Sequence, residues 1–478
     1  MKYDTYASPF SWRYGRAELR ALFSEVERRK LWRAVWVALA QAQSRRGLVS
    51  EDEVADLRAH AGDIDIEAAL QIEREIHHDL MAEIRVFSSQ AKIGGGKLHL
   101  GATSMDIEDT VETYRVRRAI ASVGAAIDVL LGSFAQKIRE YGDLVCIAFT
   151  HLQPAEPTTL GYRLAVYAQD LLIDRDALRF AFEHMTAKGL RGAVGTAASY
   201  EQLVNNSGDS AELENEVLGV FGLSARDIST QTYPRKLDYL LLSAIAGAAA
   251  SLSKFAADVR ILSSPEFGEV FEPFGATQVG SSAMPFKRNP IVCERIGSLA
   301  RLLPAYADVA WQNAATNYLE RTLDDSANRR TILPESLLCL DEIVHLATRV
   351  ITGLRVDTLR IAQNLRTYGP FAGTEPIMME AVRAGGNRQE LHESLRSAAM
   401  QSWNEIAQGK SNPLGRLLTE DPELTSRVDP AEIRRMLDPA KHVGTAPQRA
   451  RVLAARIEAL DPFPSQKEAP SMHQDTHR

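Results

Sequence analysis

Residues 280–290, Gly-Ser-Ser-Ala-Met-Pro-Phe-Lys-Arg-Asn-Pro, combine side chains that can act together on a small anion. Ser281 follows a glycine, and Lys287 and Asn289 come shortly after it. A loop of this kind can place a hydroxyl, an ammonium and an amide around one carboxylate. Asn289 and Pro290 also predict a helix start, with the asparagine as N-cap and the proline at the first helical position. The positive end of that helix would favour an anion at the same place. The alternative is an ordinary serine–glycine loop before a helix.

Three other segments carry polar side chains of chemical use. His151 lies at a predicted turn, where an imidazole can exchange a proton near neutral pH. A histidine there is also compatible with a surface or structural role. Thr103 and Ser104 offer hydroxyls within HLGATS, and Ser104 can equally serve as a helix N-cap. Residues 320–330 hold three arginines and a serine, which suit phosphate or carboxylate groups, or form a surface segment neutralised by its own aspartates.

No metal site and no cofactor are predicted. His77 and His78 fall within EREIHHDLMAEI, which we expect to be one helix in which Asp79 orients one ring. Neighbouring helical residues point about 100° apart, so the two histidines cannot easily chelate one metal ion. The three cysteines, at 146, 293 and 339, are far apart and form no Cys/His cluster. Their spacing favours a reducing compartment and hence the cytoplasm.

Composition is that of a soluble globular protein. The 478 residues are too many for one simple core, so two or three domains are expected. The net charge of −7 does not favour a nucleic-acid binder, so an anionic ligand must meet a local cluster of cations. The N-terminus lacks the apolar core of a signal peptide. The longest apolar run, Leu240–Leu252, is too short to cross a bilayer and predicts an Ala-rich buried helix.

Helical periodicity dominates the chain and predicts an all-α protein. Long periodic segments occur at 111–140, 158–187, 235–263, 290–315 and 331–356, and their apolar stripes must pack against each other as a bundle. We expect a helical N-terminal domain at 1–109, a central long-helix bundle at 110–357 and a helical C-terminal domain at 358–462. The polar residues 463–478 are expected to be disordered.

The string GSSAMPFKRNP resembles the signature of the fumarase/aspartase superfamily, whose members cleave a C–N or C–O bond beside a carboxylate and release fumarate. Further motifs resemble the adenylosuccinate lyase family in order and spacing: SPFSWRYGR, HLGATS, THLQPAEPTT, QTYPRKLD, ERTLDDSANRR and AGGNRQELHE. The resemblance implies three helical domains, a homotetramer with a 20-helix core, and active sites shared between subunits. It implies β-elimination of fumarate from a small nucleotide substrate, without a cofactor, a nucleic acid or a membrane.

Roles follow from the resemblance position by position. Ser281 would be the general base and His151 the general acid, paired with Glu294. His78, next to Asp79, would support the substrate and the acid, while Lys287 and Asn289 would hold the succinyl carboxylates. The remaining implied substrate contacts are Arg13, Tyr14, His77, Asp79, Thr103, Ser104, Thr150, Gln231, Arg295, Arg321, Ser326 and Arg330.

His77 departs from the pattern, because the family often has arginine there. A neutral histidine is a weaker phosphate ligand than arginine. This leaves open a lyase of the same superfamily that releases fumarate from a different N-succinyl adduct. A non-catalytic helical scaffold is the third interpretation, and the intact His151, Ser281 and Lys287 argue against it.

Overall fold

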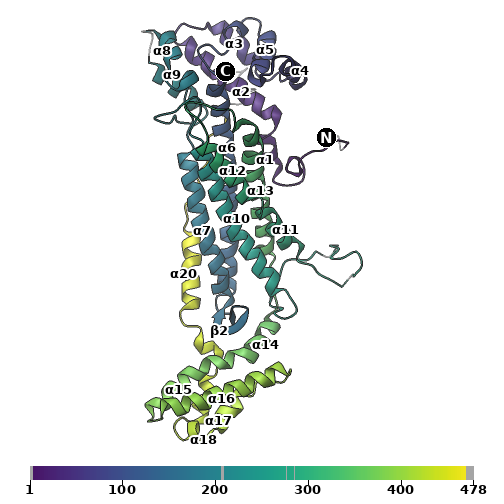
Figure 1. Ribbon diagram of the computed structural model, residues 1–478, viewed down its shortest axis with the longest axis vertical. Helices are drawn as coiled ribbons and strands as arrows, with labels where there is room; N and C mark the ends of the chain where they lie inside the picture. Colours follow the sequence, from purple (N-terminus) through teal and green to yellow (C-terminus); the bar gives the residue numbers. More distant parts are fainter. Residues whose placement is uncertain (1–3, 206–208, 276, 285, 470–478) are drawn as a thin grey trace, which may run out of the picture.

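The computed structural model describes residues 4–205, 209–275, 277–284 and 286–469, and it is elongated and almost entirely helical (Figure 1). Its α-helices are α1 (Ala17–Leu22), α2 (Glu25–Ser44), α3 (Glu51–His60), α4 (Ile66–Ile76), α5 (Asp79–Gln90), α6 (Ser104–Glu140), α7 (Leu160–His184), α8 (Ala198–Val204), α9 (Ser210–Val220), α10 (Lys236–Leu262), α11 (Ile291–Ala300), α12 (Leu303–Ala315), α13 (Ser326–Thr352), α14 (Thr358–Tyr368), α15 (Thr374–Arg383), α16 (Arg388–Ala407), α17 (Leu414–Glu420), α18 (Pro422–Thr425), α19 (Pro430–Met436) and α20 (Ala446–Glu458). Short 3-10 turns are η1 (Pro9–Ser11), η2 (Gly95–Lys97), η3 (Gly192–Val194), η4 (Gly369–Gly373) and η5 (Pro439–His442). The strands are β1 (Val145–Thr150), β2 (Gln153–Thr159), β3 (Val270–Phe271) and β4 (Arg355–Val356).

A bundle of long helices forms the middle of the molecule, which confirms the predicted fold class. Helix α6 has 37 residues, or about 55 Å at the usual helical rise. It packs against α7 and α13, while α10 packs against α7, α11, α12 and α13. Their apolar stripes meet in one core, in which Ile127, Phe134 and Leu252 are fully buried. The predicted segment 290–315 is two helices rather than one, because the chain turns at 301–302 and Pro304 opens α12.

Length and hydropathy alone would also allow α6 and α10 to cross a membrane. In the bundle both helices direct their apolar stripes toward other helices, and their buried residues belong to the central core. The apolar run 240–252 thus forms part of a buried core helix, as its composition predicts.

The upper end of the bundle carries a second apolar cluster, around Trp32, Trp36 and Phe87. It draws on residues 31–114 and, from much later in the chain, on 187–223. Helices α8 and α9 accordingly lie beside α2–α5 in Figure 1. The upper part of the fold therefore consists of two separate segments of the sequence rather than one continuous range.

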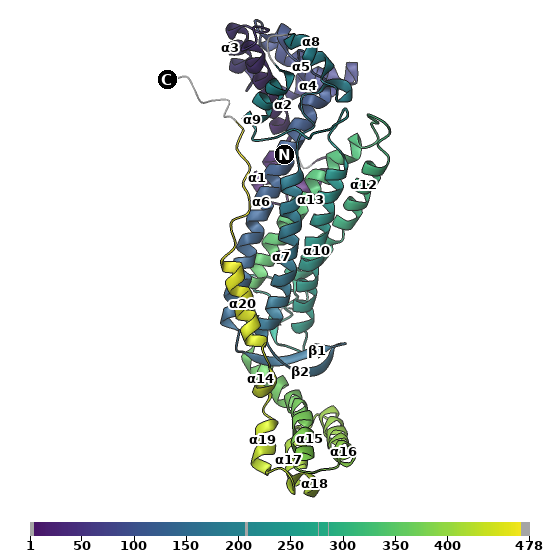
Figure 2. The same cartoon turned by 90° about the vertical axis from the view of Figure 1, so that its left-hand side faces the viewer.

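The lower end holds a third cluster, formed by α15–α19. From there the chain returns upward as α20, which packs on α6 and α7. Residues 463–469 continue alongside the bundle toward the upper cluster (Figure 2). Phe463 is buried at Gly124, and the side-chain amide of Gln466 donates to the carbonyls of Phe221 and Gly222. These seven residues differ from the disorder expected from their polar composition, and residues 470–478 lie outside the described residues.

Close backbone contact joins α6 and α7 at Gly161. A Cβ atom there would lie 2.7 Å from both the Cα of Gly142 and the carbonyl oxygen of Ile138. We expect Gly161→Ala to lower the free energy of unfolding by about 1–3 kcal/mol through overpacking. Chemical denaturation at a fixed protein concentration measures this change in the free energy of unfolding.

Gly219→Ala on α9 is the matched control, since no atom lies within 4 Å of the added methyl. It should raise stability by up to about 1 kcal/mol through helix propensity. Equal stability of Gly161→Ala and the unchanged protein would contradict the close-contact argument.

Candidate active site

A cavity of about 540 Å³ lies where α4, α5, the start of α6 and the start of α13 meet. Nine of the residues predicted to bind substrate or support catalysis line it: His77, His78, Asp79, Thr103, Ser104, Gln231, Arg321, Ser326 and Arg330. They come from four separate stretches of the chain. The fold therefore brings together about half of the predicted site within a single chain.

The helix is interrupted between α4 and α5, where one continuous helix was predicted. His77 ends α4 in the left-handed conformation (φ 55°), and His78 is the N-cap of α5. The Nδ1 atom of His78 accepts from the backbone N–H of Met81, at 3.4 Å. The neutral ring therefore carries its proton on Nε2, which lies 3.4 Å from the hydroxyl oxygen of Ser104. The break is what turns His78 toward the start of α6.

Helix α6 begins at Ser104, and its N-cap is Thr103 rather than Ser104. The N–H of Thr103 donates to the carboxylate of Asp106, at 2.9 Å. Asp106 is fully buried and also accepts from the ammonium of Lys188, at 2.6 Å. This buried ion pair, which the sequence analysis did not find, holds the two predicted hydroxyls at the cavity wall.

The two cavity arginines that were predicted to bind phosphate already hold carboxylates. Arg330 donates to Asp79, and Arg321 donates to Asp325, each at 2.7 Å. The segment 320–330 thus combines both interpretations: its aspartates neutralise it in part, and its arginines face a cavity. An anionic ligand would have to compete with, or share, these pairs.

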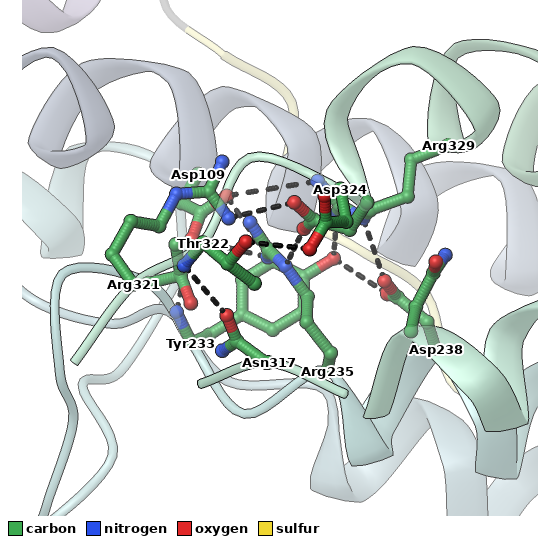
Figure 3. A network of polar contacts seen from close by, with 12 residues as sticks. Asp109, Tyr233, Arg235, Asp238, Asn317, Arg321, Thr322, Asp324 and Arg329 are labelled. Atoms are coloured by element: carbon green, nitrogen blue, oxygen red, sulfur yellow. Dashed lines mark hydrogen bonds and ion pairs between the residues drawn. The ribbon is translucent and has the colours of Figure 1, made fainter. Parts of the chain in front are cut away.

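Two residues of the cavity wall, Asp109 and Arg329, belong to a buried network of polar contacts (Figure 3), whose other members are Tyr233, Arg235, Asp238 and Asp325. Arg235 donates to Asp325 at 2.6 Å and to Asp109 at 3.1 Å. Arg329 donates to Asp238 at 2.7 Å. The sequence offers little signal of this network: the start of the long helix, SMDIEDTVETYR, holds four acidic residues, and nothing in the pattern marks Asp109 as buried.

Tyr233 completes this network. Its hydroxyl donates to Asp238 at 2.6 Å, and its N–H donates to Asp109 at 2.9 Å. Burial raises the pKa of Tyr233 well above its ordinary value, so it stays a donor. Burial opposes ionisation of Asp325, but the neighbouring arginines outweigh it and hold the pKa of Asp325 below its ordinary value.

The other nine predicted residues are not among those that line this cavity. Arg13 and Tyr14 follow η1, and the Arg13 guanidinium lies over the Tyr14 ring, 5.8 Å from its centroid. Thr150 and His151 belong to the β1–β2 hairpin, which Figure 2 shows at the lower end of the bundle. The remaining residues lie in the 272–290 loop and on α11: Ser281, Lys287, Asn289, Glu294 and Arg295.

His151 occupies a strained turn. It and Leu152 are the two central residues of the antiparallel hairpin, and both have positive φ, 54° and 59°. Asparagine and glycine favour such turns. For other residues this backbone conformation costs about 1–3 kcal/mol each. The turn leaves His151 exposed. Strain of this kind concentrates at functional sites.

The 272–290 loop projects from the side of the bundle in Figure 1. The Ser281 hydroxyl oxygen accepts from the N–H groups of Ala283 and Met284, at 3.3 and 3.1 Å. The Lys287 side chain is exposed. Pro285, within the predicted motif, lies outside the described residues.

The predicted start of α11 is wrong by one residue, and its cap is different. The N-cap is Pro290, and the Asn289 amide donates to the carbonyl of Gly280, at 3.0 Å. The buried carboxylate of Glu272 accepts from the N–H groups of Val292 and Cys293, at 3.1 and 2.9 Å. A carboxylate from outside the motif thus occupies the helix N-terminus that was expected to favour a ligand anion.

Glu294 does not pair with His151 within this chain. Its carboxylate lies 3.8 Å from the guanidinium of Arg260, and both side chains are exposed. The residues predicted to act as acid and base therefore do not line the cavity within one chain.

Solved structures of two other enzymes share this architecture. The 3-carboxy-cis,cis-muconate lactonizing enzyme of Pseudomonas putida superposes with a TM-score of 0.82 at 24% identity, over 94% of this chain and 99% of that one. A fumarate lyase from a Mesorhizobium species gives 0.81 at 24% identity with the same coverage. A lyase family model also matches residues 17–302. Fold and motifs together define a lyase of the fumarase/aspartase type.

Sequence comparison narrows this class. A model described as adenylosuccinate lyase C-terminus matches residues 370–452. The adenylosuccinate lyases of Schizosaccharomyces pombe and Saccharomyces cerevisiae are each 34% identical, over 97% and 96% of this chain and 97% of their own lengths. That of Archaeoglobus fulgidus is 34% identical over 92% of this chain and 96% of its own length. The chain belongs to the adenylosuccinate lyase family, which consists of carbon–nitrogen lyases.

The buried network generates a prediction about stability. We expect Asp238→Asn, which removes one charge without changing shape, to lower the free energy of unfolding by about 3–5 kcal/mol, because it leaves Arg329 buried without its partner. Chemical denaturation measures the change.

Glu380→Gln, in the exposed pair with Arg383, is the control and should cost at most about 1 kcal/mol. A small effect at Asp238, equal to that at Glu380, would show that the network does not hold the cavity together.

Proposed function

We propose that this chain is an adenylosuccinate lyase that eliminates fumarate from adenylosuccinate to give AMP, and from the succinyl-carboxamide ribotide to give the free carboxamide, in purine biosynthesis. The observation that carries the proposal is the full-length relationship to adenylosuccinate lyases. The cavity adds support, because it gathers hydroxyls, imidazoles and arginines suited to a nucleotide with two carboxylates.

In the proposed reaction, Ser281 takes a proton from the carbon beside one succinyl carboxylate. Negative charge builds up on that carboxylate, where Lys287 and Asn289 donate to it. The C–N bond then breaks, the carbon–carbon double bond of fumarate forms, and His151 gives a proton to the departing nitrogen. A serine is a useful base only where cations stabilise its alkoxide and water is excluded.

We further propose that the active site is assembled from several subunits of a homotetramer with a 20-helix core. Within one chain, the hairpin and the 272–290 loop do not contribute to the cavity. An exposed apolar stripe on α7 supports association: Val166, Ile173 and Phe180 are 43%, 61% and 49% exposed and recur every seven residues. Exposed side chains of this size at helical spacing on long bundle helices suit burial against a second bundle.

The proposed location is the cytoplasm. All three cysteines are free and buried. Burial raises the pKa of Cys146 to about 11, so this thiol stays protonated and poorly reactive. Free thiols of this kind fit a reducing compartment.

His77 favours one alternative, a lyase acting on a different N-succinyl adduct. Its side chain lines the cavity at the position where the family often has arginine. The purified protein should release fumarate from adenylosuccinate, followed by ultraviolet absorbance. Turnover of another succinyl-amine but not of adenylosuccinate would support the alternative, and turnover of neither would support a scaffold role.

The proposed base and acid can be tested separately. Ser281→Ala and His151→Ala should each lower kcat by about 10²–10⁴-fold while leaving the assembly intact, because each removes a proton-transfer group. Steady-state kinetics measure this, with size-exclusion chromatography to check the assembly. Ser282→Ala, next to the base in the same exposed loop, is the control and should keep most of the activity. Near-normal kcat in either variant would remove that residue from its role.

Sharing of the site between subunits makes a separate prediction. Mixing the inactive Ser281→Ala and His151→Ala proteins under conditions that exchange subunits should restore activity. Some mixed sites then draw both intact residues from different chains. Verified exchange without any recovered activity would count against a shared site.

A further inference from the structure

Glu108 is a carboxyl group in the cavity that no predicted role uses. It lies on α6 four residues after Ser104, so both side chains are on the same face of the helix. Its side chain lines the cavity with those of Asp79 and Arg330. Among the described residues, none forms a hydrogen bond or an ion pair with it. A hydrogen-bond partner for this carboxyl group can therefore come from a ligand in the cavity.

The charges around Glu108 are nearly balanced without it. Four arginines line the cavity, at 28, 321, 329 and 330, together with five acidic residues, at 73, 79, 108, 109 and 112. Asp79 holds Arg330, Asp325 holds Arg321, and Glu112 lies 3.6 Å from Arg115 on its own helix. If Glu108 were ionised, the part of the cavity lining that this chain supplies would carry one more acid than arginine, and that excess charge would weaken the binding of an anionic ligand.

Every packed element contributes to the electrostatics of Glu108. The groups that face the cavity with it are Arg28 on α2, Glu73 on α4, His77 and His78 between α4 and α5, Asp79 on α5, Asp109 and Glu112 on α6, Arg321 before α13, and Arg329 and Arg330 on α13. Burial raises the pKa of Glu108 to about 8, and Asp79 and Asp109 add to the effect. Arg28 and Arg330 act in the opposite direction but do not compensate. The surroundings of this side chain therefore favour its neutral, carboxylic acid form.

We propose that Glu108 meets the anionic group of the ligand as a neutral carboxylic acid and donates a hydrogen bond to it, so that ligand binding is coupled to a proton on this residue. The inference rests on the proposed function for the nature of the ligand, a nucleotide monophosphate. An O–H donor to a phosphate oxygen forms a short, charge-assisted hydrogen bond. An ionised Glu108 in the same place would repel that oxygen.

Coupling gives a signature that depends on pH. A bound phosphate favours the protonated form of Glu108, so binding above the pKa of the free site requires proton uptake. KM should therefore rise by up to about 10-fold per pH unit above pH 8, while kcat follows its own profile. In Glu108→Gln, whose amide donates without titrating, KM should lose this pH dependence.

Calorimetric titration of the purified protein with AMP, in two buffers of different ionisation enthalpy, counts the protons directly. At pH 8.5 the AMP phosphate is fully ionised, so it does not contribute to the proton count. We expect the unchanged protein to take up more than about half a proton per site. Glu108→Gln should take up none and still bind AMP, and Glu108→Leu, which lacks a donor, should bind about 10-fold more weakly.

Glu112→Gln is the matched control: it lies one turn further along the same helix, lines the same cavity, and should keep the proton uptake. Thermal unfolding supplies a readout without ligand. An acid whose pKa is raised by folding contributes stability that is lost as the pH rises from about 4.5 to 8. The Tm of Glu108→Gln relative to the unchanged protein should therefore increase over that range.

The outcomes separate this inference from the proposed function. If the unchanged protein neither binds AMP nor releases fumarate from adenylosuccinate, the proposed function fails. If it binds AMP without proton uptake at pH 8.5, or if Glu108→Gln takes up as many protons as the unchanged protein, the role of Glu108 is overturned. The measurement on the unchanged protein decides this even if a variant fails to fold.

Discussion

The buried ion pairs of Arg235 and Arg329 are the constraint on which the cavity depends. They join three parts of the chain that lie far apart in sequence: Asp109 on α6, Asp238 on α10, and Asp325 at the start of α13. A buried guanidinium needs its carboxylates in good geometry, so these helices cannot slide relative to one another without a large cost. The cavity-lining side chains of α6 and α13 extend from this fixed base. Rigid support of this kind is what a site needs to position ligand groups precisely.

The bundle sets the second constraint, which is distance. Helix α6 begins at the cavity and ends five residues before β1, the first strand of the hairpin. Since a packed helix of 37 residues is stiff, no local motion of one chain brings His151 to Ser104. The motif-bearing loop lies on the side of the same bundle. The long helices therefore explain why motifs that the sequence analysis grouped into one predicted site lie at separate places in a single chain.

The sequence predicted the helices well, because their apolar stripes are long and regular. It did not predict the hairpin, since β1 lacks an alternating apolar–polar pattern and β2 contains Pro154 and Pro157, so both looked like a break between helices. The break at His77–His78 was also missed, because neither glycine nor proline marks it. The cap of α11 depends on Glu272, and only the folded chain shows that it reaches those N–H groups. Glu108 gave no signal, since an acid on a long helix is normally a solvated residue.

The contact between Phe463 and Gly124 has a consequence for how the protein is made. The N–H of Phe463 donates to Asp128, which precedes it by 335 residues, and the ring fills a slot in α6 that has no side chain of its own at Gly124. On the ribosome, α6 and α7 are complete long before this segment exists. The apolar surface of α6 around Gly124, the outer seam of the bundle, therefore stays uncovered through most of translation. Chaperone binding is expected to concentrate on this seam in nascent chains, because exposed apolar surface promotes aggregation of folding intermediates.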